Sequence, residues 1–77
     1  MSKPEETPRL LNQLKVRRAM NDVTQADLAK HVGVTRKSVN SIENGHFVPS
    51  TELALKMAHV LNCTVEDLFQ LPEDVAS

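Results

Sequence analysis

The stretch from Thr24 to Gly45 has the pattern of two short helices joined by a tight turn. Thr24 is a favourable N-cap residue, and Asp27 three positions later completes a capping-box pattern. Gly33 stands where the first helix must end, and glycine tolerates the positive φ that many helix ends adopt. The apolar residues on the inward face of this helix are Val23, Leu28, Ala29 and Val32.

The second helix of the pair is predicted over about residues 36–44, with Thr35 as its N-cap and Val39 and Ile42 facing inward. A short helix that is apolar behind and rich in hydrogen-bond donors in front suits the DNA major groove. The outward side chains of this helix all donate hydrogen bonds, and they are Arg36, Lys37, Asn40, Ser41 and Asn44.

Three more helices are expected around this pair. Thr7 and Pro8 suit the cap and first residue of a helix that runs to about Met20. Ser50 suits the cap of another, whose apolar residues recur at helical spacing. The inward residues of these two helices are Leu10, Leu11 and Leu14 in the first, and Ala54, Met57, Ala58 and Leu61 in the second.

A fifth, short helix is predicted over about 65–70, because Thr64 and Asp67 repeat the capping-box pattern. The sequence thus predicts one all-α, compact five-helix domain over residues 8–71. We expect residues 1–7 to form a flexible arm and residues 72–77 a polar tail. Further apolar residues on the fourth helix exceed what one small core needs, and they are Leu53, Leu55 and Val60.

Several classes of protein are disfavoured by composition. No apolar run is long enough to cross a bilayer, and the N-terminus does not have the pattern of a signal peptide. The single cysteine, Cys63, cannot form an internal disulfide, which indicates a reducing cytoplasm. No zinc spacing or glycine-rich phosphate loop is present, so we expect no metal, no cofactor and no enzyme. Buried apolar roles are predicted for Met20, Met57 and Cys63.

Charge is distributed unevenly along a chain whose net charge is only −1. Residues 15–37 hold six lysines and arginines against two aspartates, whereas residues 64–77 hold four acidic residues and no cation. The positive block coincides with the predicted helix pair, so one end of the molecule suits phosphate and the other faces away. The alternative is a mixed, solvated surface with chance clustering.

The motifs, taken in order, resemble the phage-repressor-like family, the lambda/434 and Xre group of helix-turn-helix transcription regulators. The resemblance begins near Asn12 with NQLKVRRAMNDVTQADLA and continues through VGVTRKSVNSIENG to VPSTELALKMAHVLNCTVEDLF. It covers about three quarters of the chain and implies a lambda-repressor-like fold, with the predicted helix pair as the DNA-binding motif. The double-stranded DNA partner follows from this resemblance.

The resemblance also assigns phosphate contacts. In the family a glutamine at the start of the first motif helix contacts phosphate, and here it is Gln25. The turn after the second motif helix is the other phosphate clamp, and it maps to Asn44, Gly45 and His46. A lysine or arginine is usual where His46 stands, so we expect a weaker contact that depends on pH. The alternative is a histidine with no role.

Base contacts are implied for the first turn of the second motif helix and for one turn beyond it. Those residues are Thr35, Arg36, Lys37 and Ser41, with Asn40 alongside. Arginine can bind guanine O6 and N7 together. Lys37 stands where many relatives carry glutamine, which favours a guanine-tolerant site or a phosphate role. For both cations the alternative is a solvated face.

Relatives also pair an arginine of the first helix with a glutamate near the end of the second motif helix. These residues are Arg18 and Glu43 here, and Arg18 could offer its remaining N–H groups to phosphate. Such a pair would fix the recognition helix against the rest of the domain.

A homodimer on a palindromic operator is expected, because one helix makes too few contacts for tight specific binding. In relatives the C-terminal region is the usual dimer contact, which here maps to Val65, Leu68, Phe69 and Leu71. The extra apolar surface of the fourth helix is the alternative interface. A repressor is the first hypothesis for its role. An antitoxin with a toxin partner, a restriction controller, or an adaptor that no longer reads DNA are the alternatives.

Overall fold

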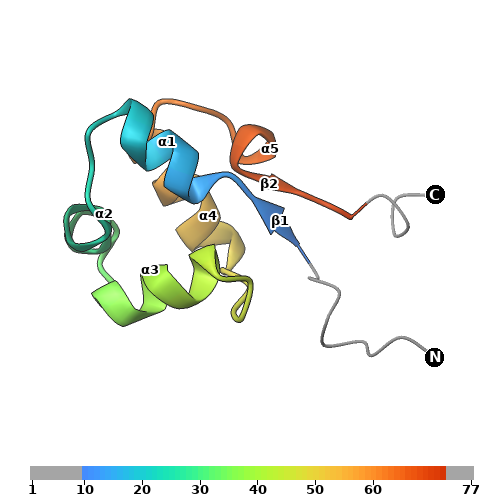
Figure 1. The fold of residues 1–77 in the computed structure, drawn as a ribbon, viewed down its shortest axis with the longest axis horizontal. Helices are drawn as coiled ribbons and strands as arrows, with labels where there is room; N and C mark the ends of the chain where they lie inside the picture. Colours follow the sequence, from blue (N-terminus) through green and yellow to red (C-terminus); the bar gives the residue numbers. More distant parts are fainter. Residues whose placement is uncertain (1–9, 73–77) are drawn as a thin grey trace.

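The computed structural model describes residues 10–72, which form five helices and one short antiparallel ladder (Figure 1). The predicted arm over residues 1–7, its neighbours Pro8 and Arg9, and residues 73–77 lie outside the described residues. In chain order the elements are β1 (Leu11–Asn12), α1 (Leu14–Met20), α2 (Gln25–Val32), α3 (Arg36–Glu43), α4 (Thr51–Val60), α5 (Val65–Leu68) and β2 (Phe69–Gln70).

Local sequence accounts for where α2 and α3 begin and end. The Thr24 hydroxyl accepts a hydrogen bond from Asp27 N at 3.0 Å, and Asp27 Oδ2 accepts one from Thr24 N at 3.3 Å. Thr35 caps α3 in the same manner, because its hydroxyl accepts from Ser38 N. Gly33 ends α2 with φ 80°, so both predicted caps and the predicted glycine turn are confirmed.

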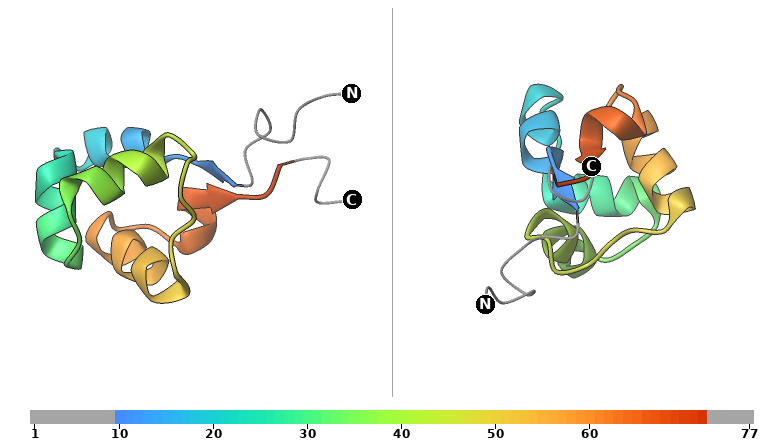
Figure 2. Two further views of the ribbon diagram at one scale, coloured as in Figure 1. Left: turned by 90° about the horizontal axis from the view of Figure 1, so that it is seen from below. Right: turned by 90° about the vertical axis from the view of Figure 1, so that its right-hand side faces the viewer.

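The core lies where the five helices converge, and it is entirely apolar among the described residues. The predicted stripe on α4 is confirmed, since all four of its residues are buried. Figure 2 shows the helices wrapped around this centre from two further sides. The core residues are Leu14, Leu28, Ala29, Val32, Val39, Ile42, Ala54, Met57, Ala58, Leu61, Leu68 and Phe69.

The prediction for the first helix was wrong at its start. The helix begins at Leu14 and not near residue 8, and Leu11 lies in β1 with its side chain exposed. Only Leu14 of the three predicted inward leucines is fully buried, while Leu10 packs against the core from its edge. Met20 was expected in the core but is 67% exposed at the end of α1.

A two-residue ladder explains the late start of α1. Leu11 pairs with Gln70 and Asn12 with Phe69, and Gln13 N donates to Leu68 O at 2.8 Å. The two ends of the domain therefore hold each other in extended conformation, which shortens α1 and also stops α5 at Leu68 instead of residue 70. The fold remains a helical domain, as predicted, with this ladder as an addition.

Across residues 10–72 no helix has the length and apolar character needed to cross a membrane. Within the same residues, no three potential metal-ligating side chains gather into one group.

Candidate nucleic-acid interface

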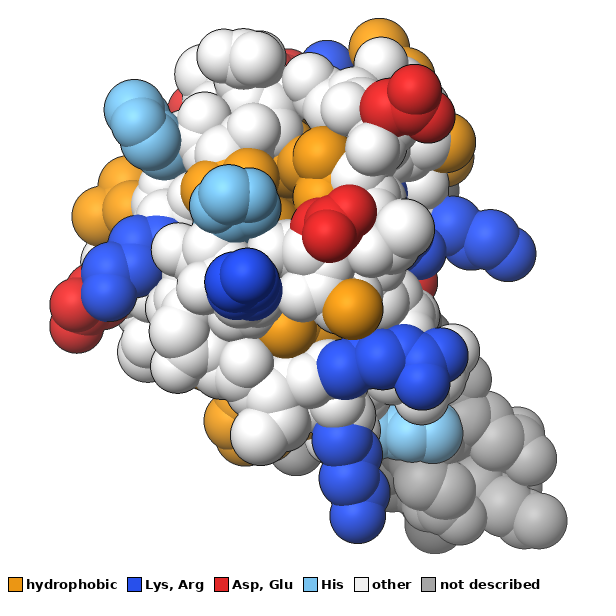
Figure 3. All heavy atoms as spheres, turned by 90° about the vertical axis from the view of Figure 1, so that its left-hand side faces the viewer, with side chains coloured by type: hydrophobic (Ala, Val, Ile, Leu, Met, Phe, Trp, Pro, Cys, Tyr) orange, Lys and Arg blue, Asp and Glu red, His pale blue; other side chains and the backbone are white. Residues whose placement is uncertain are grey.

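The helix α3 presents opposite faces to the core and to solvent. Val39 and Ile42 are buried, whereas Arg36, Lys37 and Asn40 are exposed and line a shallow hollow of about 280 Å³. Figure 3 shows one side of the molecule, where lysine and arginine side chains lie at the lower edge and also at both sides and near the centre. The helix α3 thus offers cationic and amide donors on its exposed face, where they could contact a groove.

A hydrogen-bonded network ties α3 to α1 and α2. Arg18 forms a double interaction with Glu43, through Nε to Oε2 and through Nη2 to Oε1 at 3.1 Å. The Arg18 and Glu43 side chains are only 15% and 7% exposed, so the predicted pair is present and nearly buried. Arg18 Nη1 also donates to Val23 O at 3.1 Å, which fixes the loop before α2. The network therefore sets the orientation of α3 in the domain.

Gln25 belongs to the same network. Its Nε2 donates to Glu43 Oε1 at 3.0 Å and to Asn40 Oδ1 at 3.2 Å, which engages both amide hydrogens. A phosphate contact from this amide would therefore require one of the two bonds to open. The backbone offers a readier donor, because the first bond within α2 runs from Leu28 N to Thr24 O and Asp27 N is held by the Thr24 hydroxyl. The N–H groups of Gln25 and Ala26 come before these bonded groups.

The turn after α3 uses its backbone donors internally. Gly45 adopts φ 77°, Gly45 N donates to Ile42 O at 3.1 Å, and His46 N donates to Ser41 O at 2.9 Å. Glycine is needed here because this φ is unfavourable for other residues. Gly45 therefore shapes the turn, and its N–H is bonded to Ile42 O within the protein. The exposed side chains of Asn44 and His46 remain candidates.

Two residues near α3 were not singled out from the sequence. Asn12 Nδ2 donates to Ile42 O at 3.1 Å and to Glu43 O at 3.3 Å, so β1 holds the last carbonyls of α3. No sequence signal marks Asn12, because its partners lie 30 and 31 residues away. Phe47 is 53% exposed beside α3. The sequence signal for Phe47 is its position directly after the Asn-Gly-His turn that follows α3.

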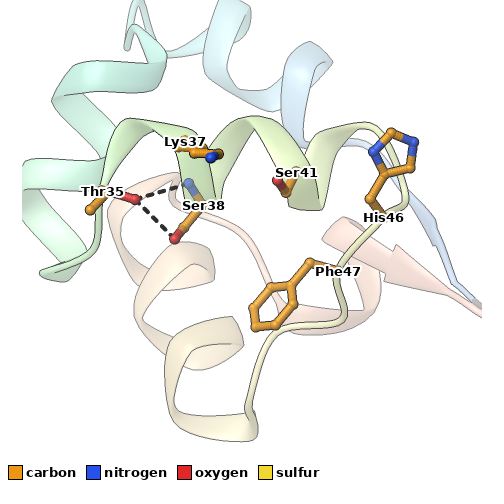
Figure 4. A pocket seen from close by; sticks show the side chains of 6 residues that line it. All are labelled: Thr35, Lys37, Ser38, Ser41, His46 and Phe47. Carbon is orange, nitrogen blue, oxygen red and sulfur yellow. Dashed lines mark hydrogen bonds between the residues drawn. The ribbon is translucent and has the colours of Figure 1, made fainter.

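Figure 4 shows the hollow in which Phe47 lies. It has a volume of about 300 Å³, and the Phe47 ring lies under α3 while His46 projects from the end of the turn. The Thr35 and Ser38 hydroxyls are hydrogen-bonded to each other at 3.0 Å. The hollow is lined by Thr35, Lys37, Ser38, Ser41, His46 and Phe47.

A second, more apolar hollow of about 410 Å³ lies beside β2. Three of the predicted dimer residues line it, Val65, Phe69 and Leu71, and so does the exposed Leu55. Leu68 is fully buried, so its side chain offers no exposed surface to a second copy. Of the alternative interface residues, Leu55 alone lines this hollow, since Leu53 and Val60 pack partly on the core.

Cys63 is half-buried against the core, and this burial raises the pKa of its thiol. A raised pKa disfavours the nucleophilic thiolate. Cys63 therefore acts as a small apolar residue, although it is less buried than predicted.

Comparison with known proteins places these features in a family. A helix-turn-helix family model matches residues 14–68, which is most of the described chain. An uncharacterized HTH-type transcriptional regulator of Methanocaldococcus jannaschii is 43% identical over 63 residues, covering 82% of this chain and 96% of that protein.

Solved structures share the fold. A putative DNA-binding protein from Bacteroides fragilis superposes with a TM-score of 0.73 at 26% identity, covering 79% of this chain and 98% of that one. The clp gene regulator ClgR from Corynebacterium glutamicum gives a TM-score of 0.67 at 31% identity. That match covers 70% of this chain but 57% of the ClgR chain.

Proposed function

The chain belongs to the Xre-type helix-turn-helix family of DNA-binding transcriptional regulators, and from this premise we propose that it represses transcription by binding a palindromic operator as a homodimer. The observation that carries the proposal is how α3 is packed and which side chains it exposes. Its apolar side is buried, its ends are held by Thr35 and Asn12, and its outer face carries exposed cationic donors.

Sequence reading is assigned to the exposed face of α3. Arg36 is the residue we expect to bind a guanine through O6 and N7, with Lys37 and Ser41 reading the neighbouring base pairs. Asn40 keeps its amide hydrogens, because only its oxygen is engaged by Gln25. Thr35 is the N-cap of α3 and lies next to the turn that precedes this helix.

Phosphate contacts position the domain. They are assigned to the first backbone N–H groups of α2, with Gln25 held nearby, and to the side chains of Asn44 and His46. Arg18 uses donors of all three guanidinium nitrogens inside the protein, so we assign it to support of α3 first and to phosphate second.

Dimerisation is assigned to the hollow beside β2. An apolar surface formed by Leu55, Val65, Phe69 and Leu71 would be covered by the same surface of a second copy, as two-fold symmetry requires. The two copies of α3 would then enter successive major grooves about 34 Å apart. We propose repression because a dimer bound across a promoter would exclude the transcription machinery. We expect this activity in the cytoplasm.

Selection of the purified protein against a random duplex pool tests the proposal. Wild type should enrich a palindrome with half-sites about one helical turn apart. The Arg36→Ala/Lys37→Ala double variant should lose this enrichment. A Lys56→Ala variant removes an exposed cation from α4, outside the positive block of residues 15–37, and should keep it. Absence of any enriched sequence with wild type would refute the proposal.

A further inference from the structure

We infer that Phe47 is a specificity residue that contacts the 5-methyl group of a thymine in the operator half-site. The inference rests on the proposed function, because it names a base and a contact for the same DNA-binding face. Its starting point is that Phe47 shares one hollow with Lys37 and Ser41, two of the residues assigned to base reading (Figure 4).

The position of the ring supports this role. Only two aromatic residues occur in the chain, and the other one, Phe69, is 9% exposed in the core. Phe47 is 53% exposed, and the hollow that it lines is large enough to receive a base edge. The turn closed by Gly45 places the ring beside α3, where about half of the residue stays open to solvent.

The chemistry of the hollow matches thymine more closely than any other base. In the major groove thymine presents a hydrogen-bond acceptor, O4, beside an apolar methyl group. The hollow places an apolar ring beside hydroxyl and ammonium donors. Thr35 and Ser38 bond to each other, so the Ser41 hydroxyl and the Lys37 ammonium are the donors we assign to O4. The Phe47 ring then receives the methyl group.

Cytosine fits this arrangement poorly, because it offers an amino donor where thymine has O4 and lacks the methyl group. Adenine and guanine lack a methyl group as well. The selected half-site should therefore contain a thymine whose methyl group matters for binding, and its absence from the selected sequence would count against Phe47 as its reader.

Deoxyuridine substitution provides the test, since it removes only the methyl group. Each thymine of the selected operator is replaced in turn, and equilibrium binding is measured for wild type and Phe47→Ala. At one thymine per half-site, the substitution should lower the affinity of wild type about fourfold. This factor corresponds to the free energy of burying one methyl or methylene group. Phe47→Ala should bind the thymine operator at least fourfold more weakly and should not distinguish thymine from deoxyuridine at that position.

Two further variants control for folding and for general loss of apolar surface. Phe47→Leu keeps an apolar contact and should retain part of the methyl effect. Val16→Ala truncates a side chain of equal exposure, 53%, on α1, and should bind as wild type does. The inference is overturned if wild type is insensitive at every thymine, or if Phe47→Ala keeps the full methyl effect. Either result would leave sequence-selective binding, and hence the proposed function, intact.

Discussion

At the scale of single residues, Glu43 joins three helices through its side chain. It accepts from Arg18 of α1 and from Gln25 of α2 while standing at the last position of α3. A carboxylate that is 7% exposed is costly unless its oxygens are bonded, and both Glu43 oxygens are. We therefore infer that the pair fixes the orientation of α3 against α1 and α2, in addition to any contribution that it makes to stability.

Glu43→Gln should separate these two effects. The amide keeps the shape but loses the charge and turns one acceptor into a donor facing Arg18 and Gln25, so we expect about 2 kcal/mol of destabilisation. In a chain of this size that lowers Tm by roughly 10 °C. Operator affinity should fall more than tenfold at a temperature where the variant is still folded. Circular dichroism melting and binding titrations measure the two quantities.

The matched control is Glu52→Gln. Glu52 pairs with Lys56 at 3.1 Å on the surface of α4, with 78% of the glutamate side chain exposed. Loss of an exposed pair should change stability by less than about 1 kcal/mol. Intact operator affinity in folded Glu43→Gln would remove the positioning role.

At the scale of elements, caps were predictable and the ends of the domain were not. Thr24, Thr35, Ser50 and Thr64 each accept the hydrogen bond that their spacing predicted. These signals are local, because a cap and its partner lie three residues apart. The start of α1 carries no such signal, since Gln13 makes no side-chain capping bond.

The ladder between β1 and β2 joins residues almost sixty positions apart, and strands of two residues are too short to show alternation. The same reason hid Asn12, whose bonds to the end of α3 exist only once the fold has formed. Within the site, the exposed face of α3 followed from helical spacing. The internal use of the Gln25 amide and the Gly45 N–H did not, because both depend on tertiary geometry.

The two capping boxes predict an acid dependence of stability. Hydrogen bonds from the Thr24 side chain and backbone lower the pKa of Asp27 below 3.8, and those from the Thr64 backbone and side chain lower that of Asp67. The ionised carboxylates therefore stabilise the folded state at pH values above about 3.8, the value expected in the unfolded chain. This contribution should disappear as pH falls through the lowered pKa values.

Melting of Asp27→Asn/Asp67→Asn between about pH 2 and pH 6 checks this expectation, because the window extends from well above to well below the ordinary aspartate pKa. The variant should melt lower than wild type near pH 6, and the difference should shrink as the pH falls. The control variant is Glu52→Gln/Glu66→Gln. It removes equal charge from the first turns of α4 and α5 and leaves both capping-box aspartates in place. A constant gap between wild type and the aspartate variant would exclude the capping boxes as the acid-sensitive groups.

At the scale of the whole molecule, the uneven charge and the exposed apolar surface lead to the same architecture. Cations gather on α1, α2 and α3, whereas Glu66 and Asp67 lie on α5, next to the hollow beside β2. In the proposed dimer, a second copy docked at that hollow would keep Glu66 and Asp67 away from DNA and would present two cationic faces together. A small apolar core also gains stability from association, because a chain of this length buries a limited fraction of its surface.

Leu71→Asp should therefore convert a dimer into a monomer. The substitution places a charge in the hollow beside β2, where Leu71 is 57% exposed in the isolated subunit and would be covered by the second copy. Sedimentation at micromolar concentration should show the change in mass, whereas Met20→Asp, at a more exposed apolar position on α1, should remain dimeric.

Operator affinity of Leu71→Asp should fall at least tenfold, and the dependence of log K on log salt should drop to about half, because a monomer neutralises half the phosphates. A Leu71→Asp protein that stays dimeric would place the interface elsewhere, while a monomeric protein with an unchanged salt slope would show that one subunit makes all the phosphate contacts.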